Sequence, residues 1–137
     1  MGRVVRHILI AEDDVRQGAG LARFLALSGH DVRIARDGRQ AEEILREYEP
    51  DVMILDLNLP EVDGWTLARR VRSNPAYTNR PLLIAVSGYN TEGHRERSRE
   101  AGFDYHLGKP IAPPVLLDLI ERAVEDAIAA EAAWLTN

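Results

Sequence analysis

The sequence predicts an α/β fold, a doubly wound parallel sheet of five strands with helices on both faces. Strand-length apolar runs recur five times along the 137 residues, and helix-length segments separate them. Runs such as ILIA and VMIL are apolar without alternation, as expected for strands that are buried on both faces. Parallel neighbours need crossover connections, and right-handed crossovers place helices on either side of the sheet.

The strands are the elements that place the candidate site. They are expected at His7–Ala11, Val32–Ala35, Val52–Leu55, Leu82–Val86 and Tyr105–Leu107. In open parallel sheets, ligands bind outside the carboxyl ends of the strands. Functional residues should therefore follow these runs directly.

Helices are expected at residues 15–29, 40–48, 65–73 and 91–102, with a further one after the last strand. Asp37 is the expected N-cap of the second helix, and Gly64 is expected to start the third through a turn. The last helix has the clearest pattern, because apolar residues from Leu116 to Ala127 recur at helical spacing. Residues 91–102 carry almost no apolar side chains, so we expect that helix to contact the core least and to be mobile.

Composition narrows the class of protein. The net charge of −5 and the 17 basic residues spread among 22 acidic ones argue against direct nucleic-acid binding. The absence of cysteine excludes disulfides and thiolate metal sites, and it suits a reducing cytoplasm. The apolar run near the N-terminus is too short for a signal peptide or a membrane span. We expect a cytoplasmic domain that does not contact the membrane.

Polar, reactive side chains follow four of the five predicted strands. Glu12 and Asp13 follow the first strand, and Asp56, Ser87 and Lys109 follow the third, fourth and fifth. Packing alone would not demand this set. The carboxyl ends of parallel strands share one edge, so these side chains are expected to meet there.

Three carboxylates at one edge repel each other. Two unit charges about 4 Å apart interact by roughly 4 kcal/mol at an effective dielectric constant near 20. Lys109 offsets one charge, and a hard divalent cation with oxygen ligands would offset the remainder, with Mg²⁺ preferred and Mn²⁺ as an alternative. The stretch EDD by itself is explained equally well as an acidic first turn that favours the helix dipole, and Asp14 is expected to have only that role.

Four stretches in this order resemble the receiver domain of two-component response regulators: ILIAEDD, PDVMILDLNLPEVDGW, PLLIAVSG and AGFDYHLGKPI. The resemblance covers about residues 7–127. It implies a flavodoxin-like sheet with the strand order 2-1-3-4-5. We expect one domain over residues 1–137, in which residues 128–137 form a helical extension.

The resemblance also implies roles for the strand-end residues. Asp56 resembles the phosphoacceptor, Ser87 the hydroxyl residue and Lys109 the basic partner. Asp13 would hold Mg²⁺ directly and Glu12 would hold it through water.

A backbone carbonyl is implied as well, because Asn58 resembles the residue whose carbonyl completes the metal shell. The metal and Lys109 would keep Asp56 ionised as a nucleophile and balance the transferring phosphoryl oxygens, while Ser87 donates a hydrogen bond.

The expected function is a phosphorylation-activated switch that accepts phosphate from a sensor histidine kinase or a phosphotransfer protein. It would catalyse only its own phosphorylation and dephosphorylation, so it is not expected to be an enzyme on external substrates. The main alternative is a Mg²⁺-dependent phosphohydrolase with an aspartyl nucleophile, which would want a second carboxylate near Asp56. A flavodoxin-like nucleotide or flavin binder is disfavoured, because no glycine-rich phosphate loop follows the first strand. A degenerate receiver that serves only as a scaffold is disfavoured because every site residue type is present.

Signal output is expected at the face formed by the fourth helix, the fifth strand and the last helix, where an unidentified downstream protein would bind. In the resembled family an aromatic residue stands three positions before the lysine, but His106 occupies that place here. His106 is therefore either a switch residue or a surface histidine without a signalling role. Tyr89 and Asn58 resemble positions that tune the access of water and thus the lifetime of the phosphorylated form.

Overall fold

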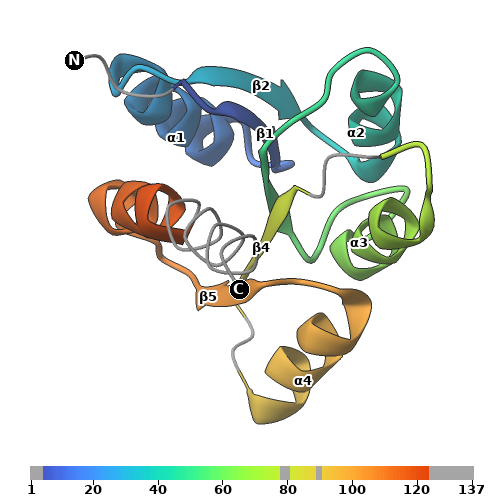
Figure 1. Cartoon of the computed structure of the whole chain (residues 1–137). Coiled ribbons are helices and arrows are strands. Elements are labelled where there is room, and N and C mark those ends of the chain that lie inside the picture. The colour runs from blue at the N-terminus through green and yellow to red at the C-terminus, as the bar shows by residue number, and fades with distance from the viewer. Residues whose placement is uncertain (1–4, 78–80, 89–90, 124–137) are drawn as a thin grey trace, which may run out of the picture.

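The computed structural model describes residues 5–77, 81–88 and 91–123. Its parallel sheet consists of β1 (His7–Ala11), β2 (Asp31–Ala35), β3 (Val52–Asp56), β4 (Leu82–Ser87) and β5 (Tyr105–Gly108). The strand order is β2-β1-β3-β4-β5, and every neighbouring pair is parallel. This confirms the predicted fold class and strand order (Figure 1).

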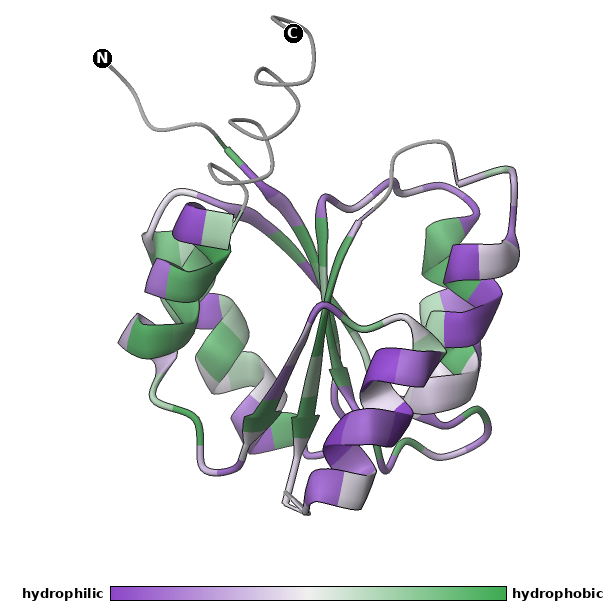
Figure 2. Cartoon of the chain, turned by 60° about the horizontal axis from the view of Figure 1, so that its bottom comes forward, coloured by the Kyte–Doolittle hydropathy of each residue, from purple (hydrophilic) through white to green (hydrophobic). Residues whose placement is uncertain are grey.

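Helices cover both faces of the sheet, as predicted. They are α1 (Val15–Leu27), α2 (Gly38–Leu45), α3 (Gly64–Ser73), α4 (Glu92–Ala101) and a C-terminal helix described over residues 113–123. Figure 2, which looks nearly along the sheet, shows α1 and the C-terminal helix on one face and α2, α3 and α4 on the other. The apolar colours of these helices face the strands, except in α4.

The core consists of two apolar layers, one on each face of the sheet. In β1, Leu9 belongs to the layer under α2 and α3, whereas Ile8 and Ile10 belong to the layer under α1 and the C-terminal helix. Successive strand residues point to opposite faces, so burial on both faces requires apolar residues at every position. This is the physical reason for the unalternating strand runs.

Side-chain caps begin the helices between the strands. Asp14 accepts hydrogen bonds from backbone N–H groups of the first turn of α1, and Asp37, Asp63 and Thr91 do the same for α2, α3 and α4. The predicted caps Asp14 and Asp37 are confirmed. These aspartates start helices just after the strand ends and so keep the connecting loops short.

Gly64 has a structural role and starts α3, as predicted, and a close approach to β3 explains why this residue is glycine. A Cβ at this position would lie 2.6 Å from the backbone oxygen of Asp56. Only a residue without a side chain allows the first turn of α3 to pack against the end of β3. The backbone of Asp56 is thereby held from the side.

The helix α4 makes the weakest contact with the core, as its polar sequence predicted. Of its residues only Ser98 and Ala101 are buried, and Figure 2 shows it almost entirely in hydrophilic colours. Trp65 of α3 compensates in part: its indole N–H donates to Ser98 Oγ at 3.0 Å, and the guanidinium carbon of Arg97 lies 3.8 Å from the ring centroid. The predicted mobility of α4 stays a prediction.

Several element ends differ from the predicted ones by one or two residues. The strands β3, β4 and β5 each include one further residue, because the ladder continues: Asp56 pairs with Val86, and Ser87 pairs with Gly108. Asp56 and Ser87 are thus the last residues of their strands rather than the first residues after them. The predicted extension at 128–137 lies outside the described residues. Among the described helices, none has the length and apolar character needed to cross a bilayer.

Candidate functional site

The predicted site residues meet at the carboxyl edge of the sheet. Glu12 follows β1, Asp56 and Ser87 close β3 and β4, and Lys109 follows β5. Backbone hydrogen bonds hold two of these positions against neighbouring strands. The N–H of Glu12 donates to Ala35 O at 2.9 Å, and the N–H of Lys109 donates to Ser87 O at 2.8 Å.

Lys109 contacts two carboxylates that lie far from it in the sequence. Its ammonium donates to Glu12 Oε1 and to Asp56 Oδ2, both at 2.8 Å. Glu12 is 8% exposed and Asp56 is 7% exposed, so these are charge-assisted hydrogen bonds in a largely buried setting. The Lys109–Pro110 peptide bond is cis.

A third carboxylate completes an acidic cluster. Ligand oxygens of Glu12, Asp13 and Asp56 lie within 4.8 Å of one another, and Asp13 is exposed while the other two are buried. Lys109 can neutralise only one of the three charges. An all-oxygen donor set with a residual negative charge and one open side fits a hydrated Mg²⁺ ion, and it fits Mn²⁺ by the same chemistry.

The ionisation of the site follows from burial and from this network. Burial, together with the contact with Asp56, raises the pKa of the Glu12 carboxyl to about 7. Burial acts on Asp56 too, but hydrogen bonds from Glu12, Lys109 and the Asn58 backbone outweigh it and hold the pKa of Asp56 below its ordinary value. For Lys109, burial is outweighed by the two carboxylates, which raise the pKa of the ammonium. Without a metal, Glu12 is therefore the carboxyl that holds a proton, and Asp56 stays ionised.

Asn58 and Ser87 frame the Asp56 carboxylate. The backbone N–H of Asn58 donates to Asp56 Oδ1 at 2.9 Å, and Asn58 itself is exposed to solvent. Ser87 is 2% exposed and ends the strand beside β3. The two Asp56 oxygens thus have different partners, Asn58 N–H on Oδ1 and Lys109 on Oδ2. The metal-binding role of the Asn58 carbonyl stays a prediction.

His106 lies on β5 and is half-buried, and its ring contacts a neighbouring helix. Its Nδ1 lies 2.8 Å from Ser98 Oγ, the same oxygen that accepts the Trp65 indole N–H. Because Ser98 Oγ accepts from Trp65, its hydroxyl proton is available for His106 Nδ1 when the ring is neutral. The chain Trp65–Ser98–His106 links α3, α4 and β5, which a solvent-exposed histidine would not do.

Sequence reasoning did not identify Ser98 or its contact with Trp65. Ser98 is surrounded in the sequence by charged residues, and nothing in that local pattern distinguishes it from a solvated serine. The signal that pointed toward it was the unusual histidine at position 106. Tyr89, the other predicted tuning residue, lies outside the described residues.

The family is decided by comparison with known proteins. A family model for the response regulator receiver domain matches residues 8–121, which includes the whole acidic cluster and, apart from His7, all five strands. The chain belongs to the response regulator receiver family. As a receiver domain, it is a component of two-component signalling.

Relatives of this receiver domain include both short and longer proteins. The response regulator MprA of Mycolicibacterium vanbaalenii is 32% identical over 134 residues, and the match covers 95% of this chain and 57% of MprA. The polar-differentiation response regulator DivK of Brucella ovis is 27% identical over 124 residues, which cover 90% of this chain and 100% of DivK. The chain thus spans little more than half the length of MprA.

A solved structure agrees with the fold. The signal receiver domain of a DNA-binding response regulator from Colwellia psychrerythraea superposes with a TM-score of 0.80 at 32% identity. The superposition covers 88% of this chain and 98% of that one. The layered arrangement described above is therefore that of a receiver domain.

Proposed function

We propose that this receiver domain is a phosphorylation-activated switch that accepts a phosphoryl group on Asp56 with the help of Mg²⁺. The observation that carries the proposal is the position of the Lys109 ammonium, 2.8 Å from both Glu12 and Asp56, beside a third carboxylate. An ionised, buried carboxylate with a cation at hand has the properties of a phosphoryl acceptor.

Each side chain has a part in the transfer. Asp56 attacks phosphorus through one of its carboxylate oxygens. The Asn58 N–H, which donates to Oδ1, orients the carboxylate. Lys109 balances the charge of the phosphoryl oxygens, and Ser87, which follows the ladder partner of Asp56 on β4, donates a hydrogen bond to one of them. Mg²⁺ held by Glu12, Asp13 and Asp56 would supply further positive charge at these oxygens.

The chain is proposed to catalyse only its own phosphorylation and dephosphorylation, in the cytoplasm. The phosphoryl group would come from a sensor histidine kinase or a phosphotransfer protein. The phosphorylated form would bind a downstream protein through α4, β5 and the C-terminal helix, without direct contact with nucleic acid. Asn58 and Tyr89 are proposed to tune the lifetime of the acyl phosphate.

Intact-mass measurement after incubation with acetyl phosphate and Mg²⁺ tests this function. We expect the wild type to gain the mass of one phosphoryl group and Asp56→Asn to gain none. Asp14→Asn is the matched control, because it removes a carboxylate from the same loop but keeps an N-cap residue on α1. The variant should be labelled like the wild type. Labelling of Asp56→Asn at the wild-type rate would contradict the proposal.

One observation favours the phosphohydrolase alternative. Glu12, whose pKa is raised to about 7, is the second carboxylate near the nucleophile that general acid–base catalysis would want. Release of inorganic phosphate from an external phosphate ester, in large molar excess over the protein, would identify that activity. A single labelling event per chain, without turnover of an ester, supports the switch instead.

A further inference from the structure

A cavity of about 530 Å³ adjoins the acidic cluster on the α1 side of the sheet. Glu12, Asp56 and Lys109 line one end of it. The rest is mainly apolar, and its walls are the ends of β1, β3 and β4, the helix α1 and the segment that follows Lys109. The apolar wall residues are Ile10, Ile54, Val86, Leu21 and Ile111. The cavity is thus continuous with the acceptor carboxylate.

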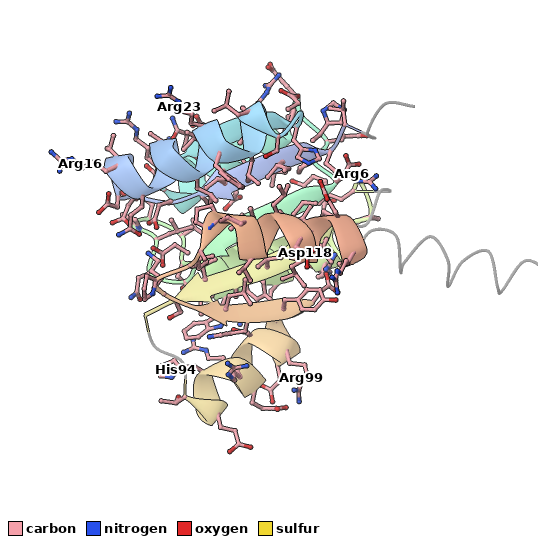
Figure 3. All side chains as sticks on the ribbon, turned by 90° about the vertical axis from the view of Figure 1, so that its left-hand side faces the viewer. Arg6, Arg16, Arg23, His94, Arg99 and Asp118 are labelled. Atoms are coloured by element: carbon pink, nitrogen blue, oxygen red, sulfur yellow. The ribbon has the colours of Figure 1, made fainter. Side chains whose placement is uncertain are left out.

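The helix α1 leaves this space open. Gly20 lies inside the helix and lines the cavity, and a Cβ built on it would meet no atom within 4 Å. Glycine is the least favourable residue in a helix interior apart from proline, and no left-handed backbone requires it here. Figure 3 shows the side chain of Arg23 extending from α1 away from the sheet, and Arg23 does not line the cavity. Arg16 and Gln17, in the first turn of α1, do line it and make its wall polar there.

The contents of the cavity are constrained by its two ends. The end at Lys109 and the acidic cluster suits a phosphoryl group under the proposed function. The other end suits an apolar group of moderate size, since an apolar space of about 150 Å³ is enough for a benzene ring. A molecule with both parts, joined by a transferable bond, would fill the cavity.

We propose that this cavity binds the acyl group of a small phosphoryl donor, and that it favours acyl phosphates with an aromatic or similarly large apolar acyl group. This inference rests on the proposed function and adds the chemical class of the donor. Gly20 is the specificity-determining residue, because its missing side chain provides the space.

The transfer step is balanced without a further reactant. An oxygen of Asp56 forms a new bond to phosphorus while the bond between phosphorus and the acyl oxygen breaks. The acyl group leaves as a carboxylate with the electron pair of the broken bond, and no proton moves. The cavity contributes by removing the apolar acyl group from water in the bound state.

The first test compares two donors, benzoyl phosphate and acetyl phosphate, by the initial rate of labelling in the presence of Mg²⁺. The quantity measured for each variant is the ratio of the two rates. The intrinsic reactivities of the two donors cancel when this ratio is compared between variants. We expect Gly20→Leu to lower the benzoyl-to-acetyl ratio about tenfold, the scale at which apolar pockets discriminate by size. The substitution replaces a helix glycine by a strong helix former, so the fold should tolerate it.

Gly93→Leu is the matched control. Gly93 lies in α4, where a Cβ would come no closer than 3.9 Å to another residue, and it does not line the cavity. Its ratio should equal that of the wild type. Equal ratios in the wild type and in Gly20→Leu would overturn the inference, whereas labelling by acetyl phosphate would still uphold the proposed function. Equal ratios in the wild type and in Gly20→Leu are also what we expect if the cavity serves only to dock a helix of a partner protein.

The second test measures binding without transfer. Benzoylphosphonate has a phosphorus–carbon bond in place of the bond that breaks, so it cannot label Asp56. With Mg²⁺ present, it should shift the amide resonances of Leu21 and Ile111 in the wild type but not in Gly20→Leu. Absence of these shifts in the wild type would overturn the inference, even if neither donor labels the protein and the proposed function fails as well.

Discussion

At the residue scale, the site depends on two buried carboxylates that share one ammonium. Asp56 and Glu12 have nearly the same exposure and the same 2.8 Å distance to Lys109, yet their pKa values shift in opposite directions. Burial is the largest single influence on the pKa of both carboxyls, but in Asp56 the hydrogen bonds from Glu12, Lys109 and the Asn58 backbone together outweigh it. A small difference in partners therefore decides which carboxyl stays ionised.

This ionisation pattern predicts how stability depends on pH in the absence of divalent metal. The pKa of Glu12 is about 7 in the folded protein and 4.5 in its ordinary state. Between these values the unfolded chain has released a proton that the folded chain keeps, so the free energy of unfolding should fall as the pH rises through this window. Urea unfolding at several pH values measures the slope.

Glu12→Gln provides the comparison for this prediction. The variant has no carboxyl to titrate at this position, so its stability should fall less than that of the wild type between about pH 5 and pH 7. Mg²⁺ should restore the wild-type stability above about pH 7, because it binds the folded form. If the free energy of unfolding changed by the same amount in the wild type and in Glu12→Gln on raising the pH, Glu12 would not be the proton-holding group.

At the scale of single elements, α4 contributes only Ala101 to the apolar core. It is joined to α3 and β5 through Ser98, whose hydroxyl lies 3.0 Å from the Trp65 indole nitrogen and 2.8 Å from His106 Nδ1. Ser98 is 1% exposed, so both bonds are shielded from water. A single oxygen thus joins α3, α4 and β5, of which α4 and β5 belong to the proposed output face.

Ser98→Ala should loosen α4 without unfolding the sheet. The substitution leaves a buried indole N–H without its acceptor, which costs about 1–3 kcal/mol of unfolding free energy. Amide hydrogen exchange should become faster in α4 while exchange in β1 and β3 changes only through global stability. Both quantities are measured on the same sample by exchange and by urea unfolding.

Ser73→Ala is the control for this helix. Ser73 is exposed at the end of α3, and its hydroxyl donates to the backbone oxygen of Arg69 at 2.8 Å. Its replacement should change stability by less than about 0.5 kcal/mol. Equal effects of the two serine substitutions would contradict the linking role of Ser98.

At the scale of the whole molecule, the proposed acceptor Asp56 and the proposed output face lie on connected elements. Ser87 closes β4, which pairs with β5, and β5 carries His106 in contact with α4. A movement at the end of β4 is therefore transmitted to β5 and α4 through a strand ladder and one side-chain hydrogen bond. The far edge of the sheet is joined to the site by the backbone hydrogen bond from Glu12 N–H to Ala35 O, but Ser87, which is proposed to contact the phosphoryl group, does not lie on that side.

Phosphorylation should therefore change this edge more than the opposite one. With acetyl phosphate and Mg²⁺, we expect backbone amide shifts in α4, β5 and the C-terminal helix that exceed those in β2 and α2. Asp56→Asn under the same conditions separates phosphorylation from the effects of metal and donor. Shifts confined to β2 and α2 would remove the proposed output face.

Much of the fold and the site could be predicted from chain-local patterns. Burial on both faces requires unalternating apolar runs such as Ile8–Ala11, and helix caps require short polar side chains such as Asp14 and Asp37. Parallel topology then brings the residues at the strand ends to one edge, so Asp56 and Lys109 could be placed together without knowing a single distance. The sequence by itself thus determined the architecture, the acidic edge and the types of residue available for chemistry.

Tertiary structure decided what those residues do to each other. Glu12 and Lys109 are 97 positions apart, and only the packed sheet defines the 2.8 Å contact between them and the burial that raises the pKa of Glu12. The acceptor for the Trp65 indole and the space beside Gly20 likewise depend on how helices lie on the sheet. Hydrogen bonds and cavities depend on distances of a few ångströms between elements, and spacing along the chain does not encode such distances.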